Sequence, residues 1–132
     1  MGAEPWSYFV PYEEDLEAAL EKLKEQVFRE GAYHGADLKP ATLDELWEKV
    51  TEDGTRSILD MEGVSEEPDF AMVTPLTKEQ LRELYGTEQP THGQVADQQD
   101  IYEMLERGQG ASVVVYEQGR PTELFFAGYS FD

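Results

Sequence analysis

The stretch from Ala111 to Phe131 decides the fold: it reads A-S-V-V-V-Y, then E-Q-G-R-P, then T-E-L-F-F-A-G-Y-S-F. The two outer runs are rich in β-branched and aromatic residues, and the five residues between them include Gly119 and Pro121. Such runs on either side of a short glycine-containing linker predict a β-hairpin with a longer turn. Because both runs are almost continuously apolar, we expect the hairpin to lie centrally in a sheet and not at its edge.

Four upstream segments place apolar residues at helical spacing, which predicts helices over residues 13–30, 42–50, 77–86 and 94–107. Thr42 and Thr77 each begin a capping-box pattern, with Glu45 and Gln80 three residues later. Gly31 is placed to end the first helix.

The remaining apolar runs predict strands. Trp6–Tyr12 reads as an opening strand, which we expect to lie beside the hairpin and bring the two termini together. Residues 56–61 and 70–73 are shorter strand candidates. This order of elements predicts a single α+β domain over residues 1–132, with a mostly antiparallel sheet, about four helices on one face and the C-terminal hairpin in the centre.

The charge balance restricts the partners. Asp and Glu number 29 against 10 Lys and Arg, which gives a formal net charge of −19. Such a field repels phosphate backbones and anionic membranes, so neither nucleic acid nor a membrane is expected as a partner. It attracts a basic protein and speeds the encounter with it. The alternative interpretation is that the acidity serves only solubility or adaptation to a salty interior.

Ten residues are candidates for contact with such a partner. The carboxylates of the first helix recur at a spacing that predicts one outward row, and residues 62–69 form an acidic loop without a basic residue. Aromatic residues of the opening strand would supply anchors beside these charges. The candidates are Glu14, Glu17, Glu21, Glu25, Glu62, Glu66, Glu67, Asp69, Trp6 and Tyr12.

No pattern indicates a catalytic centre, a metal site or a cofactor. The chain has no cysteine, no G-x-S-x-G elbow, and two histidines 58 positions apart without local ligand spacing. Residues 60–69 lack the D-x-D-x-D-G pattern of a calcium loop. The N-terminus has no signal-peptide pattern, so we expect a cytoplasmic location. If the protein does bind a small ligand or act as a small enzyme, the pocket residues would be His34, His92, Tyr33 and Tyr85.

Two sequence motifs resemble a known group. The opening W-S-Y-F-V-P-Y, followed by an acidic helix that ends F-R-E-G-A-Y, and the terminal L-F-F-A-G-Y-S-F are similar to the ends of a group of small acidic bacterial proteins whose function is uncharacterised. The resemblance implies a bacterial protein and transfers no site. In size, charge and element order the chain is also similar to the small acidic α+β immunity proteins that neutralise bacterial toxins.

Three functional hypotheses follow from these observations. The leading one is an acidic protein-binding module, immunity- or antitoxin-like, that recognises a basic partner. The second is a small-ligand-binding protein or small enzyme with a pocket between sheet and helices. The third is a homo-oligomeric structural protein whose aromatic strands pair between subunits.

Overall fold

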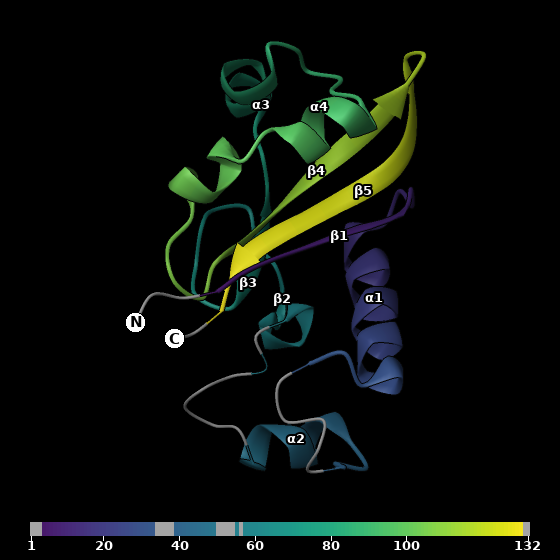
Figure 1. The fold of residues 1–132 in the computed structure, drawn as a ribbon, viewed down its shortest axis with the longest axis vertical. Helices are drawn as coiled ribbons and strands as arrows, with labels where there is room; N and C mark the ends of the chain where they lie inside the picture. The colour runs from purple at the N-terminus through teal and green to yellow at the C-terminus, as the bar shows by residue number, and fades with distance from the viewer. Residues whose placement is uncertain (1–3, 34–38, 50–54, 56, 131–132) are drawn as a thin grey trace.

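A five-stranded sheet organises the computed structural model, which describes residues 4–33, 39–49, 55 and 57–130. The strand order is β1-β5-β4-β3-β2, so the C-terminal hairpin occupies the middle of the sheet as predicted (Figure 1). The strands are β1 (Pro5–Pro11), β2 (Gly63–Val64), β3 (Met72–Pro75), β4 (Gly110–Glu117) and β5 (Arg120–Tyr129).

The hairpin turn is tighter than the predicted five-residue linker. Glu117 pairs with Arg120, so only Gln118 and Gly119 form the turn, with φ of 52° and 77°. Two central residues with positive φ are typical of a type I′ turn, whose twist matches that of the strands. The register shifts beyond Val115, and this irregularity accommodates Pro121, which has no N–H for the ladder.

β1 pairs antiparallel with β5, which confirms the prediction that the opening strand lies beside the hairpin. Trp6 lies opposite Gly128, and beyond the strand ends the Ser130 N–H donates to the Glu4 carbonyl at 2.9 Å. The described ends of the chain therefore lie side by side.

The sheet is mixed, which corrects the prediction of a mostly antiparallel one. β1, β5 and β4 are antiparallel neighbours, whereas β3 runs parallel to β4 and β2 parallel to β3. The reason lies between β3 and β4, where the chain forms α3 (Lys78–Tyr85), α4 (His92–Asp97) and the 3-10 helix η3 (Asp100–Met104). A helical crossover of this kind returns the next strand in the same direction.

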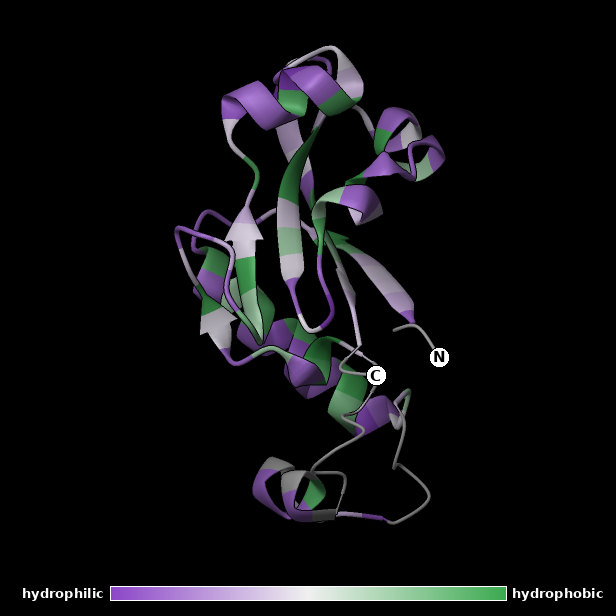
Figure 2. Cartoon of the chain, turned by 90° about the vertical axis from the view of Figure 1, so that its left-hand side faces the viewer, coloured by the Kyte–Doolittle hydropathy of each residue, from purple (hydrophilic) through white to green (hydrophobic). Residues whose placement is uncertain are grey.

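The helices lie on both faces of the sheet and not on one. α1 (Leu16–Glu30) packs with η2 (Ile58–Asp60) on one face, and α3, α4 and η3 pack on the other (Figure 1). Alternate residues of β5 face opposite ways: Phe126 joins the first core cluster and Phe125 the second. The apolar run in β5 thus supplies both cores, and Figure 2 shows hydrophobic strands between helices that carry mostly hydrophilic residues.

Three helices confirm their predictions. Asp15 caps α1 by accepting from the Ala18 N–H, and Gly31 ends it at φ 72°. α1 thus starts at Leu16, later than Glu13. The predicted helix over 42–50 appears as α2 (Leu43–Lys49), and α3 has the complete capping box predicted at its start.

Two predicted elements are wrong. Within residues 56–61 the chain forms η2 and not a strand, because the Asp60 carboxylate accepts from the Thr55 N–H and hydroxyl at 2.5 and 2.7 Å and holds a tight buried turn. The helix expected over 94–107 is divided into α4 and η3. Gln98 leaves helical geometry between them, and its side-chain amide donates to the Leu84 carbonyl at the end of α3.

Candidate functional site

The outer side of α1 carries a row of carboxylates. Glu17, Glu21 and Glu25 are exposed and recur at spacings of four, opposite the side that buries Leu20 and Leu23. Glu14 extends this row by one position just before the N-cap. We call Glu14, Glu17, Glu21 and Glu25 the acidic row.

The charge of the acidic row is only partly compensated. Glu25 pairs with Arg29 at 2.6 Å. Across the described part of the chain, no ion pair involves the other three members. Glu17, Glu21 and Glu25 therefore lie exposed along α1, whereas Glu14, which was predicted on the helix, lies exposed before its N-cap.

We call residues 62–69 the acidic loop. Gly63 and Val64 of this segment form β2, and the residues after them lead toward β3. Backbone contacts hold the loop: the Glu62 N–H donates to the Ala71 carbonyl at 2.7 Å, and the Ser65 hydroxyl donates to the Glu67 carbonyl at 2.6 Å. The predicted contact residues of the loop are all exposed, namely Glu62, Glu66, Glu67 and Asp69. Phe70, at the end of the loop, is 57% exposed.

The two predicted aromatic anchors differ. Trp6 is only 7% exposed and belongs to the core beneath α1, since its ring lies against Gly128; it is therefore not a surface contact. Tyr12 is 39% exposed, in keeping with its predicted role. Tyr12 also lies at the entrance of a hollow that the sequence did not predict.

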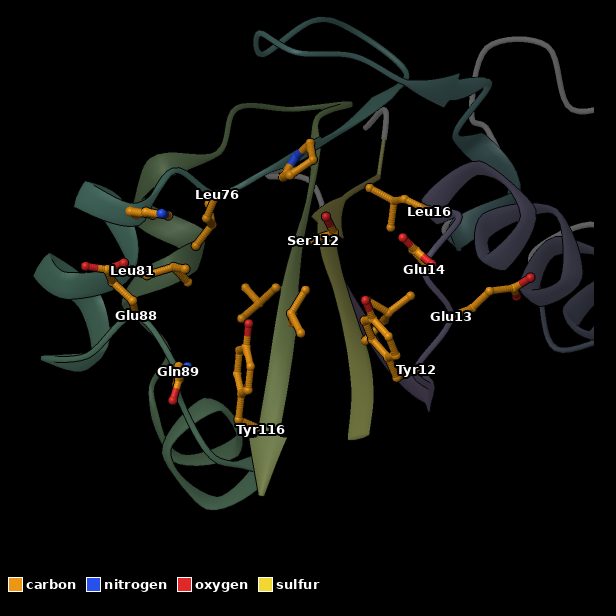
Figure 3. Close-up of a pocket in the computed structure, with 15 residues that line it drawn as sticks. Tyr12, Glu13, Glu14, Leu16, Leu76, Leu81, Glu88, Gln89, Ser112 and Tyr116 are labelled. Carbon is orange, nitrogen blue, oxygen red and sulfur yellow. The ribbon is translucent and has the colours of Figure 1, made fainter. Parts of the chain in front are cut away.

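This hollow, which we call the groove, has a volume of about 400 Å³ and lies where α1 begins (Figure 3). Its floor is formed by the central strands, by Ser112, Val114 and Tyr116 of β4 and Leu124 of β5. One wall is the connection from β1 to α1, with Tyr12, Glu13, Glu14 and Leu16. The other wall leads from β3 through α3, with Leu76, Lys78, Leu81, Glu88 and Gln89.

The rim of the groove is charged, and of its carboxylates only that of Glu14 has no ion pair to a described residue. Three carboxylates line it against one ammonium group, that of Lys78. Glu13 pairs with Lys22 at 3.0 Å, and Glu88 pairs with Arg82. Glu14 belongs both to the groove and to the acidic row, so the two features are continuous.

The groove also contains an open piece of sheet edge. The Ser112 carbonyl accepts from the Leu76 N–H at 3.1 Å, and the Tyr116 N–H donates to the Pro90 carbonyl at 2.8 Å. Because the peptide groups of alternate residues point to the same edge, those of Val114 point there too. The pairing of β3 with β4 ends at Ser112, so within the described chain no strand covers Val114 on this side.

The residues predicted for a small-ligand pocket do not meet. Tyr33 stacks on Phe28 beside α1, with ring centroids 5.8 Å apart, whereas Tyr85 packs on the opposite face of the sheet. His92 is exposed: its Nδ1 lies 2.8 Å from Glu123 Oε1, and its ring lies on Phe9. His34 lies outside the described residues.

Burial keeps the inner tyrosines protonated. It raises the pKa of Tyr85 to about 12, helped by the neighbouring Tyr102, and burial also raises the pKa values of Tyr102 and Tyr8. At neutral pH these side chains are uncharged hydroxyls. Among the residues that the structure describes, no three His, Asp or Glu side chains gather closely enough to hold a metal ion.

The groove escaped sequence reasoning because its walls come from distant segments. The one available signal was length: β4 spans eight residues and its neighbour β3 four, which leaves part of β4 without a partner.

No helix within the described ranges is long and apolar enough to cross a membrane. Comparisons with protein-family models, curated proteins and solved structures find no match to this chain.

Proposed function

We propose that the protein is a cytoplasmic bacterial binding module whose acidic surface recognises a basic protein, in the manner of an immunity protein or antitoxin. The acidic row carries the proposal: it consists of four exposed carboxylates, of which only Glu25 has an ion pair to a described residue, on a chain of net charge −19. Uncompensated charge of one sign steers an oppositely charged partner and raises its association rate.

In this proposal the acidic row raises the rate at which the partner associates, and the groove provides the affinity that retains the partner. Binding energy in protein interfaces concentrates on a few anchors in desolvated pockets, surrounded by a polar rim. The groove has this composition, with an apolar floor, a charged rim and the exposed Tyr12 at its entrance. Because Glu14 belongs both to the groove and to the acidic row, we expect a single partner to contact both.

A small ligand is the second candidate for the same place. A volume of about 400 Å³ lies within the range of small-molecule sites. Self-association through the sheet is less favoured, because two copies that each carry −19 repel one another and Pro5 and Pro11 interrupt the outer edge of β1.

The test of the proposed function compares two matched triple variants. Glu17, Glu21 and Glu25 are changed to Gln in one, and the exposed Glu79, Glu83 and Glu103 in the other, so that each loses three negative charges. Basic proteins captured from a bacterial lysate at low salt are identified by mass spectrometry, purified and measured against wild type and both variants by surface plasmon resonance.

We expect the acidic-row variant to slow association several-fold and the control variant to change it much less, because local charges act within about a Debye length of 8–10 Å. Equal slowing by both variants would show that only the net charge of the protein matters, and not the position of the acidic row. Association that neither variant nor salt alters would contradict the electrostatic part of the proposal.

A further inference from the structure

In the part of the chain that the structure describes, the groove combines an apolar floor, an unpaired carboxylate at its entrance and a short uncovered piece of sheet edge. Val114 and Leu124 face one another across the floor, and Leu16 closes it beside α1. Glu14 stands at the entrance without an ion pair to any described residue. An occupant that fits both the apolar floor and the Glu14 carboxylate needs a long apolar stem and a cationic head.

The open edge is too short to receive a strand. At one end the Leu76 N–H already donates to the Ser112 carbonyl, and at the other the Tyr116 N–H already donates to the Pro90 carbonyl. Among the described residues, only the N–H and carbonyl of Val114 are left between them for a further hydrogen bond. Strand addition depends on a series of main-chain hydrogen bonds along an edge. One residue of edge does not support such a series, so the groove suits an inserted side chain and not a strand.

Two tyrosines favour a planar cation. Tyr116 rises from β4 at one side of the opening, and Tyr12 lies with Glu14 at the other (Figure 3). A guanidinium group stacks on aromatic faces and donates in a fixed plane to carboxylate and carbonyl oxygens, whereas a lysine ammonium is a compact, strongly hydrated charge. A hydrophobic stem with a guanidinium head is the arginine side chain.

We propose that the groove takes an arginine side chain presented by the basic partner, with its stem over Val114 and Leu124 and its guanidinium at Glu14. This inference rests on the proposed function and adds how the partner is anchored. A second copy of the chain does not fit the role, since its own charge of −19 opposes the approach.

The test uses N-acetyl-arginine amide as the probe and the full chain labelled with ¹⁵N. The probe is titrated while backbone amide resonances are followed, with two comparison probes: the citrulline derivative, which is nearly isosteric and uncharged, and the lysine derivative. We expect saturable shifts at Val114, Tyr116 and Glu14 with arginine, at least threefold weaker binding with lysine, and no saturation with citrulline.

Three variants assign the effect to the groove. Glu14→Gln should weaken arginine binding about threefold, as expected for one exposed ion pair. Glu103→Gln removes the same charge from an exposed position outside the groove and the acidic row, and it should leave arginine binding unchanged. Tyr12→Leu keeps the apolar bulk, loses the aromatic face and should weaken binding in the same direction as Glu14→Gln. A well-dispersed spectrum of each variant verifies that it folds.

Several outcomes would overturn the inference. Shifts spread over all acidic surfaces, equal responses to arginine and citrulline, or equal effects of Glu14→Gln and Glu103→Gln would each do so, as would the absence of shifts. The captured partner separates this failure from that of the proposed function. If a basic protein binds wild type and the Glu14→Gln/Tyr12→Leu double variant equally, the anchor is wrong and the binding module stands.

Discussion

Gly128 shows how closely single residues are fitted in this protein. A Cβ atom at Gly128 would lie 2.3 Å from Trp6 Cζ2 and 2.6 Å from the Gln109 carbonyl oxygen. The indole is buried in the core and the carbonyl belongs to the backbone, so neither can move away cheaply. The absence of a side chain at Gly128 therefore leaves room for the Trp6 ring where β1 pairs with β5.

We predict that Gly128→Ala lowers the free energy of unfolding by about 1–3 kcal/mol, the usual cost of overpacking. Urea denaturation followed by circular dichroism measures it. Gly93→Ala is the matched control, because Gly93 lies in α4 and its Cβ would meet nothing within 4 Å. Alanine is the better helix former, so this control should be neutral or slightly more stable. Equal losses in both variants would contradict the packing argument.

Tyr85 gives a prediction for alkaline pH. Its folded-state pKa is raised to about 12, whereas an unfolded tyrosine ionises near 10. The unfolded chain therefore loses this proton first, and the contribution of Tyr85 to stability is complete below about pH 10 and declines as the pH rises toward 12. Tyr85→Phe should reduce the loss of stability between about pH 9 and pH 11.

The same variant has an expected result at neutral pH. Within the described structure the buried Tyr85 hydroxyl has no hydrogen-bond partner, so its removal should not destabilise the protein. Urea denaturation of wild type and Tyr85→Phe at about pH 7, 9 and 11 tests both statements. A variant that is destabilised at neutral pH, or that loses stability in alkali as wild type does, would contradict them.

At the level of elements, α3 is held by its N-terminal cap as well as by partly buried apolar side chains. It contains no fully buried residue, and its first turn is secured by a reciprocal capping box between Thr77 and Gln80. Leu81, on this helix, forms part of the groove wall. The start of α3 thus couples local helix stability to the shape of the candidate site.

We predict that Thr77→Ala lowers the free energy of unfolding by about 0.5–2 kcal/mol, because an N-terminal N–H of the helix loses its acceptor. Thr77→Ser retains the hydroxyl and should cost much less. Hydrogen exchange should also become faster in α3 of the alanine variant while the exchange of β4 and β5 stays slow. Indistinguishable serine and alanine variants would show that the cap has no part in holding α3.

For the whole molecule, the charge of −19 acts against folding as well as toward a partner. Like charges brought together in the folded state repel, and added salt screens them over about 10 Å at 0.1 M. We predict that the midpoint of thermal unfolding rises by several degrees between about 20 mM and 500 mM NaCl. Differential scanning calorimetry measures it, with sucrose as an uncharged control, and a midpoint that salt leaves constant would contradict the prediction.

Much of the architecture was already present in local patterns. The apolar run at 111–131 and its glycine predicted the central hairpin, and Gly31 and Thr77 marked helix ends, because strands and caps depend on residues near in sequence. The exposure of Glu17, Glu21 and Glu25 along α1 followed from helical spacing alone.

Patterns of this kind could not assign faces or long-range contacts. Phe125 and Phe126 are adjacent in a strand and so face opposite sides of the sheet, but the sequence does not say which helix covers which side, and the prediction placed all helices on one face. Gln98 divides the predicted helix 94–107 through a hydrogen bond to Leu84 in another helix. Trp6 looked like a surface anchor until its position against Gly128 placed it in the core.

The sequence by itself determined the α+β class, the central hairpin and the net charge of −19, since these depend on composition and on neighbours along the chain. Only the tertiary structure decided the parallel placement of β3, the two-sided core and the groove. Each of these requires segments far apart in sequence to meet, as Tyr12, Leu76 and Val114 do, and such meetings depend on how the elements pack.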